Sequence, residues 1–151
     1  MKRSIAREIA VQLSYSYFNN TLPVEELLDN FLSQEYYSTL AQEEELFSEF
    51  PDARQEKYIR SLVTLVASNY VDIDKKIETY SKNWKTERFS GTSLNILRCA
   101  VSEILFMDDI PVSVSINEAV ELAKKYDSDE AASFINGILG SLVKGLNSSA
   151  E

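Results

Sequence analysis

Apolar residues recur at steps of three and four along the last third of the chain, and this spacing continues without interruption through Asn136-Gly137. An Asn-Gly pair between apolar residues is normally a strong short-range signal for a β-hairpin turn. A hairpin would change the spacing to two, because successive side chains of a strand point to opposite faces. The spacing instead stays that of an amphipathic helix. We therefore predict a single helix through this pair, with the apolar positions Phe134, Ile135, Ile138, Leu139, Leu142, Val143 and Leu146.

A glycine inside this helix needs a compensation, since it costs about 1 kcal/mol relative to alanine. The expected compensation is close packing, in which Gly137 and Gly140 let a neighbouring helix approach. Asn136 would then lie partly in the core and take hydrogen-bond partners from another segment. Asn117 is expected to help hold the two last helices together.

The rest of the chain shows the same spacing. Few residues interrupt it, since the whole chain contains only 4 Gly and 3 Pro. Helices are expected near residues 5–17, 23–36, 58–70, 73–84, 94–105 and 116–123, and residues 41–52 as a loop or a frayed helix end. Ser115 and Glu118 have the spacing of a capping box, with Ser113 as a competing cap. The predicted class is all-α, with about seven helices.

Length and composition predict one folded domain. The chain has 151 residues, 44% of them apolar, and these suffice for one core. No apolar run approaches the roughly 20 residues of a membrane span, and the amino terminus is amphipathic rather than a signal peptide. The single cysteine rules out an internal disulfide. We expect a soluble cytoplasmic protein with one domain over residues 1–147 and a flexible tail over 148–151.

The net charge of −9 is located in one window of the sequence. Residues 25–56 hold ten carboxylates and one base, Arg54, while the remainder has 14 acids and 14 bases. The protein therefore has an acidic lobe, and its neutral remainder can carry local positive patches.

Catalysis is not expected from this sequence. There is no histidine in the chain. A zinc site would therefore lack one of its usual ligand types, and an acyl-transfer site would lack its commonest general base. Arg98 and Glu103 interrupt an apolar helix, and buried charges of this kind are usually paired with another element. Cys99 lies among apolar neighbours, as a small buried hydrophobe does. No enzyme activity, cofactor or metal is predicted.

Two motifs, "INEAVELAKKY" followed by "FINGIL", resemble the NusB family of bacterial transcription antitermination factors. The stretch "AREIAVQLSYSYF" is similar to that family's first helix, and "ERFSGTSLNILRCAVSEILF" with "IPVSVSINEAVELAKKY" to its carboxy-terminal half. The resemblance covers nearly the whole chain, most strongly residues 88–142. It implies two packed helical bundles that bind the single-stranded boxA element of ribosomal RNA transcripts. It also implies a heterodimer with the ribosomal protein NusE and assembly with RNA polymerase.

The resemblance assigns RNA binding to the amino-terminal helix and to one later base. Cations contact phosphates, an amide can read a base edge, and a phenol ring can stack on an unpaired base. The matching residues are Lys2, Arg3, Arg7, Gln12, Tyr15 and Arg88. The alternative is a solvated amphipathic helix with charged flanks. Trp84, between Lys82 and Lys85, is expected to belong to the core instead.

The resemblance places the contact with NusE on the outer part of the helix near 116–123 and on the connection that follows. Glu121, Lys124 and Glu130 are the candidate residues. The alternative is a solvated turn in which Asp127 or Asp129 caps the last helix.

The amino-terminal helix departs from the family, because many members have a denser arginine cluster there. Fewer phosphate contacts predict weaker binding by this protein alone and more reliance on its partner. The main alternative is therefore a helical protein–protein interaction module of the same fold with little RNA affinity. NusB-like domains also precede RNA methyltransferase domains, but this sequence contains no glycine-rich cofactor loop. A homodimer is a further possibility that the sequence leaves open.

Overall fold

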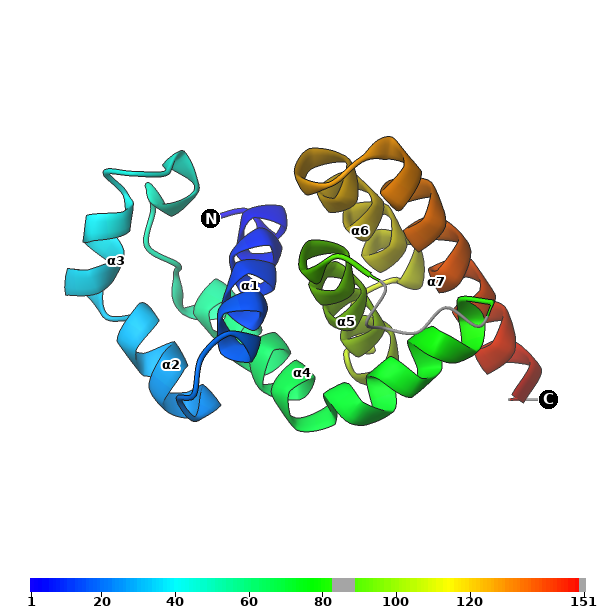
Figure 1. Ribbon diagram of the computed structural model, residues 1–151. Coiled ribbons are helices and arrows are strands. Elements are labelled where there is room, and N and C mark those ends of the chain that lie inside the picture. Colours follow the sequence, from blue (N-terminus) through cyan, green and yellow to red (C-terminus); the bar gives the residue numbers. More distant parts are fainter. Residues whose placement is uncertain (83–88, 150–151) are drawn as a thin grey trace. The chain divides into compact units, whose positions relative to one another are not determined.

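The computed structural model describes residues 1–82 and 89–149, and every regular element within these ranges is a helix (Figure 1). The predicted all-α class is therefore confirmed. None of these helices is long and apolar enough to cross a membrane. In chain order they are α1 (Arg3–Phe18), α2 (Val24–Phe31), α3 (Gln34–Leu40), the short 3-10 helix η1 (Glu45–Phe47), α4 (Ala53–Tyr80), α5 (Gly91–Phe106), α6 (Val112–Tyr126) and α7 (Asp129–Ser149).

The helices form two compact units, Met1–Ala67 and Ser68–Glu151. The amino-terminal unit contains α1, α2, α3, η1 and the first part of α4, and the carboxy-terminal unit contains the rest of α4 with α5, α6 and α7. Two units agree with the two bundles that the family resemblance implies. Helix α7 continues through Ser149, so part of the stretch expected to form a tail is helical.

The helix through Asn136-Gly137 is confirmed, but the reason expected for its glycines is wrong. A Cβ atom at Gly137 or Gly140 would meet no described atom within 4 Å. Asn136 and Asn117 are both exposed, so neither belongs to the core between α6 and α7. The close approach occurs at Gly145, where a Cβ would overlap the ring of Tyr80, with Cζ only 2.7 Å away.

Two predicted helix boundaries are also wrong. The helix expected over 23–36 is divided into α2 and α3, because the Ser33 hydroxyl accepts a hydrogen bond from the Tyr36 N–H (3.3 Å) and caps a new helix. The two helices expected over 58–70 and 73–84 form one helix, α4. No glycine or proline separates them in the sequence, so nothing local ends the first.

The predicted capping box at the start of α6 is absent. The residue before α6 is Pro111, whose φ of −58° suits a helix start, and no side chain caps it. Ser115 is 1% exposed and donates its hydroxyl hydrogen to Glu103 Oε1 (2.8 Å), which joins α6 to α5. Arg98 forms the expected ion pair with another element. It donates from Nε and Nη2 to the two carboxylate oxygens of Asp74 in α4 (2.9 and 2.7 Å).

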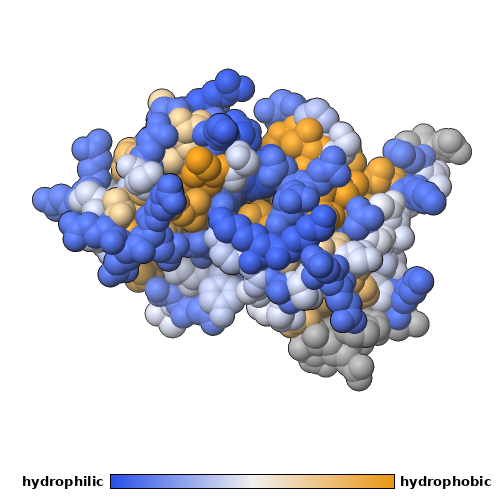
Figure 2. All heavy atoms as spheres, turned by 90° about the horizontal axis from the view of Figure 1, so that it is seen from above, coloured by the Kyte–Doolittle hydropathy of each residue, from blue (hydrophilic) through white to orange (hydrophobic). Residues whose placement is uncertain are grey.

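The acidic segment of the amino-terminal unit rests on an aromatic cluster. Tyr37 lies edge-on to Phe31, Phe47 and Phe50, at 5.9, 5.6 and 5.1 Å between ring centroids. Its hydroxyl donates to the Glu49 carbonyl oxygen (2.9 Å), and burial raises the pKa of Tyr37 to about 12. The carboxylates themselves stay on the surface. In the view of Figure 2, hydrophilic side chains are interspersed with hydrophobic areas.

Candidate nucleic-acid interface

Helix α1 begins with several positive charges and no cap of its own. Lys2 occupies the N-cap position without a capping side-chain hydrogen bond, and the first turn contains no acidic residue. Positive charge near a helix amino terminus is unfavourable, because the helix dipole is positive there. Contacts from outside α1 must therefore stabilise this start.

Those contacts come from the first turns of α4 and from two carboxylates that precede this helix. Arg3 donates from Nε to Gln55 Oε1 (2.7 Å), and its guanidinium lies 4.1 Å from the centroid of the Tyr58 ring. The Arg7 guanidinium is 5.7 Å from the same centroid. One buried ring of α4 thus serves both arginines by cation–π contact.

Asp52 connects the start of α1 to the start of α4. Its Oδ1 accepts the N–H of Gln55 (3.0 Å) and so caps α4, while Oδ2 accepts from the Met1 ammonium (3.4 Å). Glu49 accepts from the same ammonium (3.1 Å). The backbone hydrogen bond from Gln55 is the main cause of a lowered pKa at Asp52, and the Glu49 hydrogen bond is the main cause of a raised pKa at Met1.

Four of the five candidate residues lie in α1 and separate into two groups, while Lys2 precedes the helix. Arg3 and Arg7 share the side of α1 that faces Tyr58, and Arg7 is only 4% exposed. Gln12 and Tyr15 lie roughly 80–180° around the helix axis from the two arginines, given 3.6 residues per turn. Gln12 is half-buried and Tyr15 is 46% exposed, while Lys2 is exposed. The surface of α1 that can meet a ligand therefore includes Lys2, part of Arg3 and Tyr15.

The remaining basic candidate, Arg88, lies outside the described residues, as do Trp84 and Lys85. Lys82 is described and exposed, with a positive φ of 56° two residues after the end of α4.

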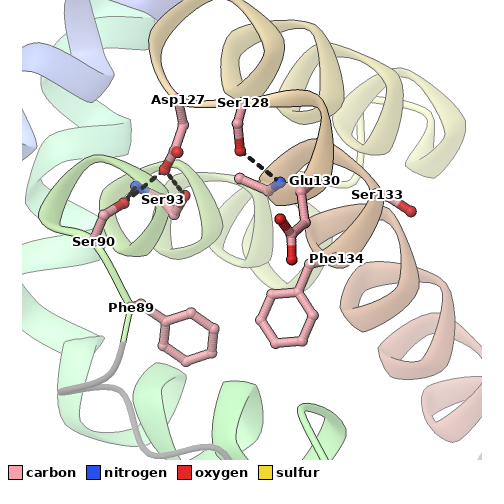
Figure 3. Close-up of a pocket in the computed structure, with 9 residues that line it drawn as sticks. Phe89, Ser90, Ser93, Asp127, Ser128, Glu130, Ser133 and Phe134 are labelled. Atoms are coloured by element: carbon pink, nitrogen blue, oxygen red, sulfur yellow. Dashed lines mark hydrogen bonds between the residues drawn. The ribbon is translucent and has the colours of Figure 1, made fainter.

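The carboxy-terminal unit contains an open pocket of about 510 Å³ between the start of α5 and the α6–α7 connection. Figure 3 shows Phe89 and Phe134 on one side of it, with the Glu130 carboxylate directed toward Phe134. The two rings are 5.5 Å apart between centroids and tilted by 31°. The pocket therefore combines aromatic surface with a carboxylate.

Asp127 and Ser128 form the opposite wall of this pocket (Figure 3). Asp127 Oδ2 accepts from the hydroxyls of Ser93 (2.6 Å) and Ser90 (2.8 Å), and these bonds lower the pKa of the carboxyl. The Ser128 hydroxyl accepts the Ala131 N–H (3.0 Å) and caps α7. The alternative that Asp127 or Asp129 caps the last helix is therefore wrong, because the neighbouring serine does so.

The three candidate partner-binding residues do not form one cluster of contacts. Glu121 and Lys124 are exposed on α6 and pair with each other across one helical turn (3.6 Å). Glu130 is exposed in the first turn of α7, at the pocket. Among the described residues, no group of three or more metal-ligating side chains could hold an ion.

The sequence reasoning missed Gln55, Tyr58 and Phe89. Tyr58 occupies an apolar position of the helical pattern and is 5% exposed, as expected of a core residue. The apolar pattern therefore does not indicate that its ring also contacts two arginines. Gln55 is 7% exposed, but it follows the charged stretch read as a loop. Recognising Asp52 as the cap of a helix would have placed both residues on the first turns of α4.

A family model described as the NusB family matches residues 4–144. A relative called transcription antitermination protein NusB, from Natranaerobius thermophilus, is 43% identical over 148 residues, which are 97% of this chain and 98% of the relative. NusB of T. maritima has a similar solved structure (TM-score 0.77, 28% identity, 95% of this chain and 92% of that one). A crystal structure of the antitermination factors NusB and NusE with double-stranded RNA shares the fold (TM-score 0.74, 22% identity, 95% and 96% coverage).

Proposed function

The chain belongs to the NusB family, and from this premise we propose that it is a transcription antitermination factor that binds boxA RNA of ribosomal RNA operons together with NusE. The family consists of antitermination factors rather than enzymes, in agreement with the sequence prediction. We further propose that it acts in the cytoplasm as part of an RNA polymerase antitermination complex.

One observation carries the RNA part of the proposal: Arg3 and Tyr15, roughly 120° apart around the axis of α1, both expose part of their side chains. Nε is the one guanidinium nitrogen of Arg3 that donates to another described residue, so its two terminal nitrogens stay open to a phosphate. Lys2 adds an exposed cation, and Tyr15 offers a ring for stacking on an unpaired base. In this proposal Gln12 reads a base edge, and Arg88 adds a phosphate contact.

Arg7 enters this proposal differently from the other cations. Because it is 4% exposed, it supplies positive charge beneath the surface rather than a direct phosphate contact. Its shared contact with Tyr58 helps to fix the direction of α1.

The proposed partner surface combines the exposed outer side of α6 with the pocket at the start of α7. Glu121 and Lys124 present charges of opposite sign, which favour a polar rim of an interface. Glu130 lies beside the aromatic surface of Phe134, which can contribute buried apolar area. The solved structure of the antitermination factors NusB and NusE with RNA supports a partner of this kind for the family.

The second candidate function is a protein–protein interaction module with little RNA affinity. It is favoured by the internal contacts of Arg3 and Arg7 and by the carboxylates of Glu49 and Asp52 beside the amino terminus. The carboxylates lower the positive potential of the proposed RNA surface, and the internal contacts reduce the exposure of the two guanidinium groups.

The deciding experiment is a titration of boxA RNA and of a scrambled RNA with this protein, with and without NusE, at two salt concentrations. The proposed function predicts selective binding of boxA that strengthens with NusE and weakens with salt. Equal binding of both RNAs under all conditions, with retained NusE binding, would support the second candidate instead.

A further inference from the structure

We propose that Gln55 and Tyr58 are positioning residues for RNA binding, which hold the Arg3 guanidinium so that its two terminal nitrogens face a phosphate. This inference rests on the proposed function, because it concerns how α1 binds RNA. The two residues belong to α4 and are buried, so they are not themselves placed to contact RNA.

The geometry constrains Arg3 from two directions. Gln55 Oε1 takes the Nε hydrogen at 2.7 Å, which fixes the edge of the guanidinium, and the Tyr58 ring at 4.1 Å fixes its plane. A guanidinium has five N–H donors in a rigid fork, and the pair of terminal nitrogens matches two phosphate oxygens. Because Gln55 holds the Nε edge of the Arg3 guanidinium and Tyr58 holds its face, the edge with the two terminal nitrogens has a fixed orientation.

Gln55 and Tyr58 themselves belong to a regular helix. The Gln55 N–H is bonded to the Asp52 carboxylate in the first turn of α4, and Gln55 and Tyr58 are three residues apart on one face of that helix. Both side chains thus come from a capped, regular helix rather than from a loop. Arg3 belongs to an uncapped helix start, which by itself would fray.

The energetic consequence is pre-organisation. Immobilising a long side chain on binding costs about 0.5–1.5 kcal/mol, and a side chain already held in place avoids that cost. Loss of the hydrogen bond or of the ring should therefore weaken RNA binding roughly two- to tenfold. This effect partly offsets the small number of arginines in α1.

The test uses three substitutions and one control. Gln55→Met keeps the side-chain length and removes the acceptor, Tyr58→Leu removes the ring, and Tyr58→Phe keeps it. Gln34→Met is the matched control, since Gln34 is exposed at the start of α3. Each full-length variant is titrated with boxA RNA, and its thermal unfolding is recorded.

A second measurement, made without RNA, reports directly on the contact between Arg3 and Gln55. Hydrogen exchange of the Arg3 Nε–H, measured by NMR, should be slow in the original protein and in Gln34→Met, and faster in Gln55→Met. Equal exchange in the original protein and Gln55→Met would overturn the positioning of Arg3, whatever the RNA result.

A double-mutant cycle separates positioning from general stability. If Gln55 acts through Arg3, Gln55→Met weakens RNA binding in the original chain and has no further effect when Arg3→Met is present. Tyr58→Phe should retain affinity and Tyr58→Leu should lose it. Equal weakening by Gln55→Met in both backgrounds, or unchanged affinity in the original chain, would overturn the proposal.

Failure of the proposed function gives a different result. The original protein would then bind boxA and scrambled RNA alike, with or without NusE, while the Arg3 Nε–H stays protected. That outcome would overturn a role of this docking in RNA recognition and leave Arg3 as a structural contact only.

Discussion

At the residue scale, Gly137 and Gly145 of α7 differ in the space available for a side chain. Gly137 is exposed and open, whereas a Cβ at Gly145 would overlap Tyr80. Gly137→Ala should stabilise the protein by up to about 1 kcal/mol through helix propensity. Gly145→Ala should destabilise it by about 1 kcal/mol, because overpacking costs about 1–3 kcal/mol and outweighs the same gain.

Urea unfolding of both variants measures this difference, since the two substitutions are chemically identical and lie in one helix. Equal stabilisation by both would show that Tyr80 moves aside at little cost. The helix was predictable from the sequence, but the glycine at which another helix approaches closely was not. The sequence does not show which glycine of a helix faces a neighbouring helix.

Tyr15 provides the second prediction at this scale. It is 46% exposed, so Tyr15→Ala should leave the melting temperature nearly unchanged. Loss of one stacking ring should weaken boxA binding by about 1–3 kcal/mol. Tyr36→Ala is the matched control, because Tyr36 is 50% exposed on α3 and outside the proposed RNA surface. RNA titration compares the two variants, and equal affinities would contradict a stacking role for Tyr15.

Single polar residues were the least predictable part of the chain. Asn117 and Asn136 belong to the motifs "INEAVELAKKY" and "FINGIL", and we expected them to hold the last two helices together. Both side chains are exposed instead. Arg98 was predictable, since a charge inside an apolar helix requires a partner, and Asp74 provides it. A pattern therefore indicates that a buried charge is paired, but it does not reveal the use of an exposed amide.

At the scale of elements, helix type was predictable and helix ends were not. The apolar spacing indicated α1, α5, α6 and α7 correctly. The division between α2 and α3 depends on Ser33, a cap whose partner is a backbone N–H three residues later. Many serines have such a neighbour, so the sequence alone does not show which of them caps a helix.

One connection between elements has a pH dependence that can be stated in advance. Asp127, at the end of α6, accepts hydrogen bonds from Ser93 and Ser90 at the start of α5, and these lower its pKa in the folded state. A carboxyl with a lowered folded pKa stabilises the protein above its unfolded pKa of about 3.9. This stabilisation is lost as the pH falls through the lower, folded pKa.

Asp127→Asn should therefore be less stable than the original protein at pH 7, and the difference should shrink below about pH 4. Denaturant unfolding between pH 3 and pH 7 measures it. Asp129→Asn is the control, because Asp129 is exposed and accepts no hydrogen bond from α5 among the described residues. A gap between Asp127→Asn and the original protein that is constant with pH would contradict the assignment.

At the scale of the whole molecule, the acidic window of the sequence becomes a defined segment of the amino-terminal unit. Its carboxylates lie on the surface, and two of them contact the Met1 ammonium. The charge window and the basic residues of α1 are each evident from the sequence by themselves. It did not show that Glu49 and Asp52 meet the start of α1, because that contact joins segments about fifty positions apart.

This arrangement predicts that the acidic segment opposes RNA binding without affecting sequence preference. Glu43, Glu44 and Glu45 are exposed, and replacing all three by Gln changes the net charge from −9 to −6. Affinity for boxA and for scrambled RNA should rise by the same factor, a few-fold at low salt, because the repulsion is long-range. At 1 M salt, where the screening length is about 3 Å, the effect should vanish. Titrations across a salt series measure it, and a gain confined to boxA would instead mean that these glutamates take part in selecting the RNA.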